Sequence, residues 1–456
     1  MALFNIASTV LIAGINFITI PIFTRMLDTA GYGIVNVYVA WVQICVVLVG
    51  LKADGSIGSA KANLPDEEQD SYHFSILMMS LAVFAVLFCA VLLFLHPLSE
   101  LLSMSPVLTV CMMVQSFGAF VVGVFNMCFI FKKEAQKNFA VSVGLCIATT
   151  LLSIALIFFV FTGDQGYLGR VYGLVIPNVL IGAGLFVHLA LSKGKKLKLG
   201  YWKFCLALTV PLIFHGLSQL LLAQTGKIAI QQMFGDSPAG IYSIAVVIVS
   251  LLGAIYNALN NAFVPFMYDD LAGKTSEEKK QGHFRNYFTS FTLGTCAFAL
   301  IAPEILKLMS TEAYWSAIGV LPLLTIGQYC IFLYSFPVNY EFYKMKTKSV
   351  AVGTVLAAIL CVALTVWLTP SYGMYGAAFS TMAAYVGLFI FHFCIARYRL
   401  GDRNYPARYY LIGLAVVVCV CLACYPLGDT VIIRWAVAIV ALALVALRVY
   451  KTRSVF

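Results

Sequence analysis

Two cations, Arg25 and Lys227, each lie at the end of a long apolar run of the sequence. An arginine binds a phosphate through two parallel hydrogen bonds, and a lysine acts on it as a point charge. Two such groups facing one cleft would bind a phosphate or pyrophosphate headgroup. The alternative is that both side chains only reach out of the apolar layer to the outer membrane interface.

Uncharged polar side chains gather in the two apolar runs 204–224 and 239–266. They are His215, Ser218, Gln219, Gln224, Asn257, Asn260 and Asn261. On a helix the three asparagines share one face, as do His215, Ser218 and Gln219. Such groups must face protein or water rather than lipid. They either line a cavity that hydrogen-bonds sugar hydroxyls or hold helices together, which is the commoner role. His215 is the best mid-membrane candidate for a titrating group.

Acidic residues are predicted only at the ends of the apolar runs, with none deep inside one. A pump for cationic drugs would use a buried carboxylate to attract its substrate, so this pattern argues against such a pump.

Arg170 and Arg434 are predicted to be interface residues. Almost all thirteen cysteines lie inside apolar runs, where cysteine is a small buried hydrophobe. Their spacing predicts no disulfide framework, no metal site and no cofactor.

The elements that carry these residues follow from composition. The chain has 456 residues, 62% hydrophobic and only 11% charged, with a mean hydropathy of +0.94. So few charges cannot cover a soluble globule, which excludes a soluble enzyme, a nucleic-acid binder and a disordered chain. Continuous runs of about 20 residues predict membrane-spanning helices, not a barrel of alternating strands. The predicted spans are 4–24, 33–51, 74–96, 106–131, 139–161, 171–191, 204–224, 239–266, 286–302, 314–339, 349–369, 374–396, 409–427 and 431–447.

The short connections between these fourteen spans allow the positive-inside rule to be applied. Of the 29 Lys and Arg residues, those predicted on one side are only Arg25, Arg170, Lys227, Lys307 and Arg434. The opposite side is therefore predicted to be cytoplasmic, and both termini lie on it. A cleaved signal peptide is not expected, because no basic segment precedes the first run.

The sequence also repeats itself at an offset of 207 residues. MLDTAGYGIVNVYVA from Met26 aligns with MFGDSPAGIYSIAVV from Met233, which pairs Gly33 with Gly240. A second repeated segment pairs Lys137 with Lys348 at a similar offset. These repeats predict an all-α membrane protein with two six-helix bundles related by pseudo-two-fold symmetry, at residues 1–200 and 201–400. Residues 401–456 add two spans. Rocking of one bundle against the other would give alternating access, and prolines at 21, 177, 211, 265 and 322 could kink the spans.

Three segments resemble signatures of the bacterial polysaccharide and O-antigen flippase family. They are PIFTRMLDTAGYGIVNVY, TGKIAIQQMFGDSPAGIYSIA and APEILKLMSTEAYWSAIGVLPLL, in the family's order and spacing. Arg25 and Asp28 fall on the first pattern. Gly226 and Lys227 stand where many members carry an Asp-Arg pair, so the cation is kept and the acid is lost. This family is the polysaccharide transporter branch of the multidrug/oligosaccharidyl-lipid/polysaccharide exporter superfamily.

The resemblance implies a carrier, not an enzyme, in the bacterial cytoplasmic (inner) membrane. Its substrate would be an undecaprenyl-pyrophosphate-linked oligosaccharide, an O-antigen, capsule or exopolysaccharide unit, moved from the cytoplasmic to the periplasmic leaflet. H⁺ or Na⁺ is a possible coupling ion, and a polysaccharide polymerase with chain-length machinery is a possible partner beside the membrane lipids. An ion-coupled multidrug or metabolite exporter is the alternative. A membrane polymerase or glycosyltransferase is a third, disfavoured because the outer connections are short and hold only scattered acids.

Overall fold

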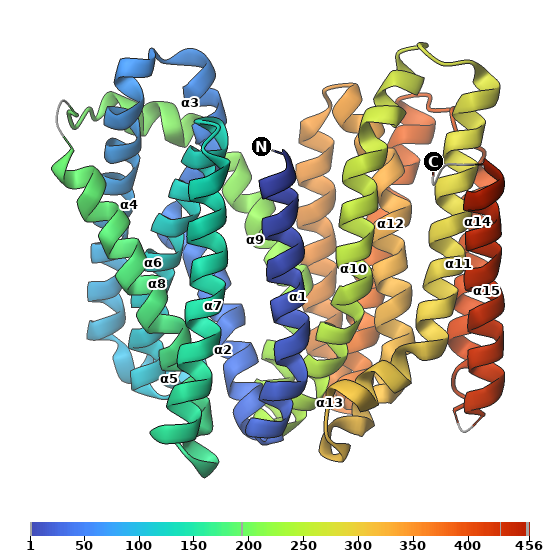
Figure 1. Cartoon of the computed structure of the whole chain (residues 1–456), viewed down its shortest axis with the longest axis horizontal. Helices are drawn as coiled ribbons and strands as arrows, with labels where there is room; N and C mark the ends of the chain where they lie inside the picture. The colour runs from blue at the N-terminus through green and yellow to red at the C-terminus, as the bar shows by residue number, and fades with distance from the viewer. Residues whose placement is uncertain (1, 193–194, 429, 453–455) are drawn as a thin grey trace. The chain divides into compact units, whose positions relative to one another are not determined.

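The computed structural model describes residues 2–192, 195–428, 430–452 and 456, and the regular elements of this part of the chain are all helical (Figure 1). The chain divides into two compact units. The first comprises residues 1–220 and 234–240, and the second comprises residues 221–233 and 241–456. Helix α9 therefore passes from one unit into the other within its length.

The helices of the first unit begin near the amino terminus. Its main helices are α1 (Ala2–Met26), α2 (Thr29–Gly50), α4 (Gln69–Leu93), α6 (Pro106–Phe131), α7 (Ala135–Phe159), α8 (Gly166–Leu191) and the first part of α9 (Gly200–Phe234). Short helices η1 (Ala53–Ser56), α3 (Ile57–Asn63), η2 (Asp66–Glu68), α5 (Leu95–Leu101) and η3 (Gly163–Gln165) occupy the connections.

The second unit holds the remaining helices. They are α10 (Asp236–Leu271), whose first turn belongs to the first unit, α11 (Glu277–Met309), η4 (Glu312–Val320), α12 (Leu321–Tyr343), α13 (Thr347–Cys394), the π-helical turn η5 (Ile395–Arg399), α14 (Ala407–Ala423) and α15 (Val431–Thr452). Helix α11 packs against both α14 and α15, which lie beside it in Figure 1.

The predicted spans agree with these helices. Twelve helical segments of the described chain are long and apolar enough to cross a membrane, and α14 is a shorter apolar helix. One of the twelve, residues 347–399, covers two predicted spans because α13 bends at Gly373, whose φ of 55° and ψ of −133° are not helical. Glycine adopts this conformation at little cost. The prediction of an all-helical protein with many spans is confirmed.

Local sequence signals set several helix ends. The Asp28 side chain caps α2 by accepting a hydrogen bond of 2.8 Å from the Gly31 backbone N–H. Ser105 caps α6, and Pro106 follows in its first turn, where a missing N–H costs nothing. Four of the predicted kinking prolines, Pro21, Pro177, Pro211 and Pro265, lie inside helices. The fifth, Pro322, lies in the first turn of α12.

The repeat at an offset of 207 has a structural counterpart at the start of α2 and α10. A Cβ atom on Gly33 would overlap the Asp236 carbonyl oxygen, and one on Gly240 would overlap that of Thr29. Thr29 and Asp236 are themselves 207 residues apart. Exchanging the two repeats therefore converts the contact of Gly33 with Asp236 into the contact of Gly240 with Thr29. This is the pattern of a local two-fold axis, and it requires glycine at both positions because the backbones touch. The nearby hydroxyls of Thr29 and Ser237 lie 2.7 Å apart.

Arg434, which is predicted to be an interface residue, lies in the first turn of α15 with its side chain buried in its own unit. Its side chain is 1% exposed, and its Nη1 donates to Glu304 Oε2 at 3.0 Å and to the Leu300 carbonyl at 2.8 Å. An apolar run with one arginine looks the same whether that arginine faces lipid headgroups or a carboxylate on another helix. Arg170 is also drawn into its unit, with its guanidinium 4.0 Å from the centre of the Phe23 ring.

The acidic residues lie near helix ends, as expected, but two of those described are buried. Glu341, in the last turn of α12, is fully buried, and its Oε1 lies 2.6 Å from Nδ1 of the equally buried His392. Asp270 is 4% exposed and pairs with His283 at 3.0 Å. The interpretation that the chain buries no carboxylate among its helices therefore needs correction. Position along a span does not reveal that a neighbouring helix covers the side chain.

Candidate functional site

A pocket of about 650 Å³ opens in the first unit and contains two of the predicted site residues, His215 and Gln219. Both project from α9. Gln43 from α2 and Lys52 from the turn after α2 complete its polar lining, and the apolar lining residues are Val42, Val46, Val47, Ala119, Leu212 and Leu220. The pocket therefore combines one cation, two amides and an imidazole with apolar walls, a lining able to bind a polar headgroup.

Lys52 was not predicted as a site residue, because a lysine after an apolar run is typical of a cytoplasmic connection. Its position follows from local backbone geometry. Leu51 and Lys52 have φ values of 48° and 54°, which end α2 and turn the chain sharply. Gly216 on α9 leaves room for the lysine, since a Cβ there would lie 3.1 Å from Lys52 Cε. The Lys52 ammonium lies 3.9 Å from Asp54 Oδ2 and is partly exposed.

Lys227 lies in the part of α9 that belongs to the second unit and is only 9% exposed. Gln224 and Gln231 are also buried, and their spacing of three and four residues from Lys227 places all three on one face of the helix. Among the described residues, no carboxylate forms an ion pair with Lys227. A buried ammonium group without a counter-ion is costly in a membrane segment, so this position is a functional candidate.

The predicted asparagines lie on α10 in the second unit. Asn260 Oδ1 accepts a long hydrogen bond of 3.5 Å from Asn339 Nδ2 on α12, whereas Asn257 and Asn261 are exposed. One turn before Asn257, a Cβ on Gly253 would lie 3.2 Å from the amide group of Gln328 on α12. The structure thus adds two amides, Gln328 and Asn339, to the predicted set. They were missed because they occur singly in an aromatic-rich run.

Arg25 ends α1 in the first unit, and its side chain is exposed. Its Nη1 donates a hydrogen bond of 2.9 Å to the Pro21 carbonyl, one helical turn earlier. Arg25 and Lys227 thus belong to different units, and the predicted role of the two as a pair stays a prediction. The described residues contain no group of three or more His, Cys, Asp or Glu arranged to hold a metal ion.

Comparison with known proteins identifies the family of the chain and proteins of similar fold. A family profile described as "Polysaccharide biosynthesis protein" matches residues 2–269. The capsular polysaccharide biosynthesis protein CapF of Staphylococcus aureus is 22% identical over 58% of this chain and 69% of its own length. A lipid II flippase MurJ in an inward closed conformation aligns with a TM-score of 0.69 and 12% identity, covering 99% of both chains.

A multidrug resistance transporter of the MATE family, in an inward-facing conformation, aligns with a TM-score of 0.61 and 15% identity. It covers 84% of this chain and 97% of its own. At such low identities these structures show the fold alone. That fold is the one predicted for the multidrug/oligosaccharidyl-lipid/polysaccharide exporter superfamily.

Proposed function

The chain belongs to the polysaccharide biosynthesis protein family, and from this premise we propose that it moves a lipid-linked oligosaccharide across the membrane by alternating access. It is a multi-pass membrane transporter of the exporter superfamily, not an enzyme. The proposed substrate is an undecaprenyl-pyrophosphate-linked repeat unit of O-antigen, capsule or exopolysaccharide, taken from the cytoplasmic leaflet to the periplasmic leaflet of a bacterial inner membrane. Both termini lie in the cytoplasm in this proposal.

The observation that carries the proposal is the buried ammonium group of Lys227. No carboxylate pairs with it among the described residues, so within this part of the chain no ion pair neutralises its charge. Desolvating an ammonium group is expensive, and the cost is recovered when an anion arrives. A pyrophosphate is a suitable anion, because it offers several oxygens to a single point charge and to the neighbouring amides of Gln224 and Gln231.

The pocket in the first unit supports the same substrate class. Lys52 supplies a second cation, while Gln43, His215 and Gln219 supply donors and acceptors for sugar hydroxyls. Its volume of about 650 Å³ is in the range of sites that bind small ligands. The pairing of polar groups with apolar walls suits a substrate that has both a glycan and a lipid tail.

The exposed amides of α10 provide a further argument. Asn257 and Asn261 lie within a span, where an amide facing lipid would leave its hydrogen-bonding groups unsatisfied. Their exposure is therefore explained if this face of α10 borders water or substrate during transport. Neutral amides bind sugar hydroxyls without regard to pH, which is consistent with a glycan substrate.

An ion-coupled exporter of drugs or metabolites is the alternative. The buried Glu341 gives it some support, because a carboxylate inside the helices is what such a pump uses. However, Glu341 is already engaged by His392 and Ser349, whereas the ammonium group without a carboxylate partner favours an anionic substrate. H⁺ or Na⁺ remains our proposed coupling ion, and a polysaccharide polymerase with its chain-length machinery our proposed partner.

Surface polysaccharide in a deletion strain complemented with variants tests this proposal. Lys227→Gln should lower the polymer roughly tenfold or more at unchanged protein abundance, because one charge-assisted contact contributes about 1.5–3 kcal/mol. Arg25→Ala should lower it less, since that side chain is exposed. Lys227→Arg keeps the charge and should retain part of the activity.

The matched control is Lys307→Gln, which removes an exposed lysine that lies over the Trp315 ring. It should leave the polymer at the wild-type level. Normal polymer in the Arg25→Ala/Lys227→Ala double variant would remove both cations from the transport path.

A further inference from the structure

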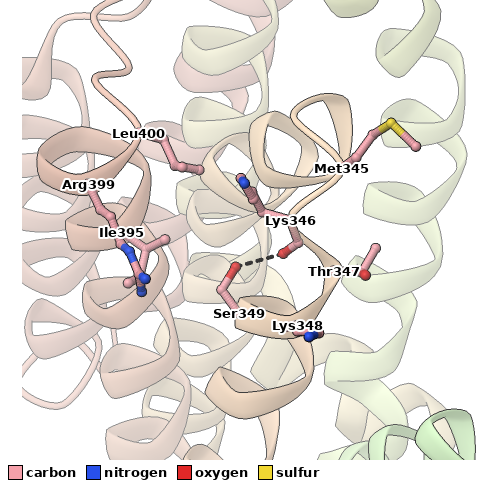
Figure 2. Close-up of a pocket in the computed structure, with 8 residues that line it drawn as sticks. All are labelled: Met345, Lys346, Thr347, Lys348, Ser349, Ile395, Arg399 and Leu400. Carbon is pink, nitrogen blue, oxygen red and sulfur yellow. Dashed lines mark hydrogen bonds between the residues drawn. The ribbon is translucent and has the colours of Figure 1, made fainter.

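A second pocket of about 650 Å³ lies in the second unit, where α12 ends and α13 begins (Figure 2). It is lined by the segment 345–349 and by Ile395, Arg399 and Leu400 of η5 and its end. Three of the lining residues are cations, Lys346, Lys348 and Arg399, and none is acidic. In Figure 2 the arginine and the lysines approach the pocket from opposite sides.

Several cations in other connections of the chain are paired with acids, unlike those of this pocket. Lys61, Lys132, Lys137 and Lys198 in the first unit form ion pairs with Asp66, Asp70, Glu134 and Glu68, and Lys274 and Lys280 in the second unit pair with Asp269 and Glu277. In the described chain neither pocket lysine, nor Arg399, has an ion-pair partner. All three are exposed. The positive charge of the pocket is therefore left for a ligand.

Two acids lie close to the pocket in sequence, Asp402 and Glu341, and each is engaged by other residues. Asp402 Oδ1 accepts hydrogen bonds from the backbone N–H and the side-chain amide of Asn404. Glu341 is fully buried against His392 at 2.6 Å, and the Ser349 hydroxyl donates to its other carboxylate oxygen. The same hydroxyl shares its one hydrogen with the Lys346 carbonyl oxygen, 2.7 Å away, the bond drawn in Figure 2. This network holds the start of α13 in place and keeps the Glu341 carboxylate out of the pocket.

Apolar side chains complete the lining. Met345 is 85% exposed, and Ile395 and Leu400 border the same space. Tyr398, beside Arg399, is 75% exposed, and exposed tyrosines at helix ends are typical of the membrane–water interface. A free phosphate ion would use only the cations, whereas a lipid would use the cations for its headgroup and the apolar residues for its chains.

We propose that this pocket binds the phosphate headgroup of an anionic membrane lipid. Basic pockets at the ends of membrane helices are known to suit such headgroups. The site is contained in the second unit and uses neither Arg25 nor Lys227, so it does not depend on the proposed transport substrate. Lys346, Lys348 and Arg399 bind the phosphate oxygens, and the apolar rim packs against the first carbons of the acyl chains.

Lipid retention during purification tests the proposal. The full-length protein is reconstituted in nanodiscs of phosphatidylcholine with or without phosphatidylglycerol, extracted gently, and examined by native mass spectrometry for bound lipid. The wild type should retain phosphatidylglycerol, and the K346Q/K348Q/R399Q variant should bind it roughly tenfold more weakly. Replacing exposed side chains leaves the core unchanged, and a monodisperse elution profile checks the fold of the variant.

A control variant separates this site from general surface charge. K133Q/K196Q/K203Q removes three other exposed cations, which lie outside the pocket, and should retain the lipid as the wild type does. The proposed site would be overturned if both variants lost bound phosphatidylglycerol to the same extent. It would also be overturned if the pocket variant retained as much of this lipid as the wild type. Inorganic phosphate is added as a separate arm. If phosphate does not displace phosphatidylglycerol from the wild type, the assignment of the pocket to a lipid is supported. If phosphate binds the wild type while phosphatidylglycerol does not, the lipid assignment is wrong.

For the wild type alone, retention of phosphatidylglycerol should fall as salt is raised, because exposed charges are screened. Retention that is independent of salt would contradict a headgroup held by exposed cations. This measurement needs no variant and therefore stands even if a substitution impairs folding.

Discussion

At the scale of single residues, two buried cations differ in a way that has consequences for stability. Arg434 is paired with Glu304 and also donates to backbone carbonyls, whereas no carboxylate pairs with Lys227 in the described chain. Removing one partner of a buried ion pair leaves the other charge uncompensated, but removing a buried cation that has no counter-ion relieves a cost. The two residues should therefore respond to substitution in opposite directions.

Arg434→Met should lower the free energy of unfolding by about 3 kcal/mol, because Glu304 keeps a charge without its partner. Lys227→Met should leave stability equal or raise it while transport is lost. Thermal unfolding of the purified protein in detergent measures both. If Lys227→Met lowered the melting temperature as much as Arg434→Met, the ammonium group would have a stabilising role, and its assignment to substrate would lose its basis.

The sequence predicted a residue of the candidate site only where the type of the residue and its position in the chain were enough to single it out. Lys227 stands out because it is one of the few cations predicted on the side opposite the cytoplasm, and it is indeed buried. Lys52 was missed because its place in the pocket depends on two left-handed residues, which the sequence does not signal. The ion pair of Arg434 was not predicted, because its partner Glu304 is 130 residues away in the chain and one sequence does not reveal such a pairing.

At the scale of elements, the first turns of α2 and α10 meet through Gly33 and Gly240. Each glycine lies against the backbone of the other segment, so a side chain at either position would displace a helix and not merely another side chain. This contact links two segments 207 residues apart and is the clearest structural trace of the repeat.

Gly33→Ala and Gly240→Ala should each destabilise the protein by about 1–3 kcal/mol, as expected when extra atoms enter a packed contact. Gly123→Ala on α6 is the control, since a Cβ there would have nothing within 4 Å. The midpoint of thermal unfolding distinguishes them. A Gly33→Ala variant as stable as Gly123→Ala would show that the contact tolerates a methyl group.

Most elements of the fold follow from the sequence because about 20 apolar residues have few alternatives to a membrane helix. The predicted spans all coincide with helices, including the two that join in α13. The short helices α3 and α5 and the 3₁₀ segments η1, η2 and η3 were not predicted. They lie in connections of mixed polarity, where packing against neighbouring helices decides the backbone and hydropathy carries little information.

At the scale of the whole molecule, its charge pattern favours an anionic lipid-linked substrate. Many carboxylates near the helix ends pair with lysine, histidine or arginine. Among the described residues, Lys227 and the three cations of the second-unit pocket have no such partner. The family is one of polysaccharide biosynthesis, and the fold is similar to that of a lipid II flippase and of a MATE transporter. Together these support a carrier in which binding of phosphate recovers the cost of buried positive charge.

The most direct test is translocation by the purified protein in liposomes. An undecaprenyl-pyrophosphate-linked oligosaccharide is placed in one leaflet, and its arrival in the other is followed with a glycan-modifying enzyme that cannot cross the membrane. The account predicts transfer with the wild type, transfer reduced at least about tenfold with Lys227→Gln, and none in empty liposomes. Transfer by Lys227→Gln at the wild-type rate, or none by a wild-type protein that instead exports a cationic drug, would contradict it.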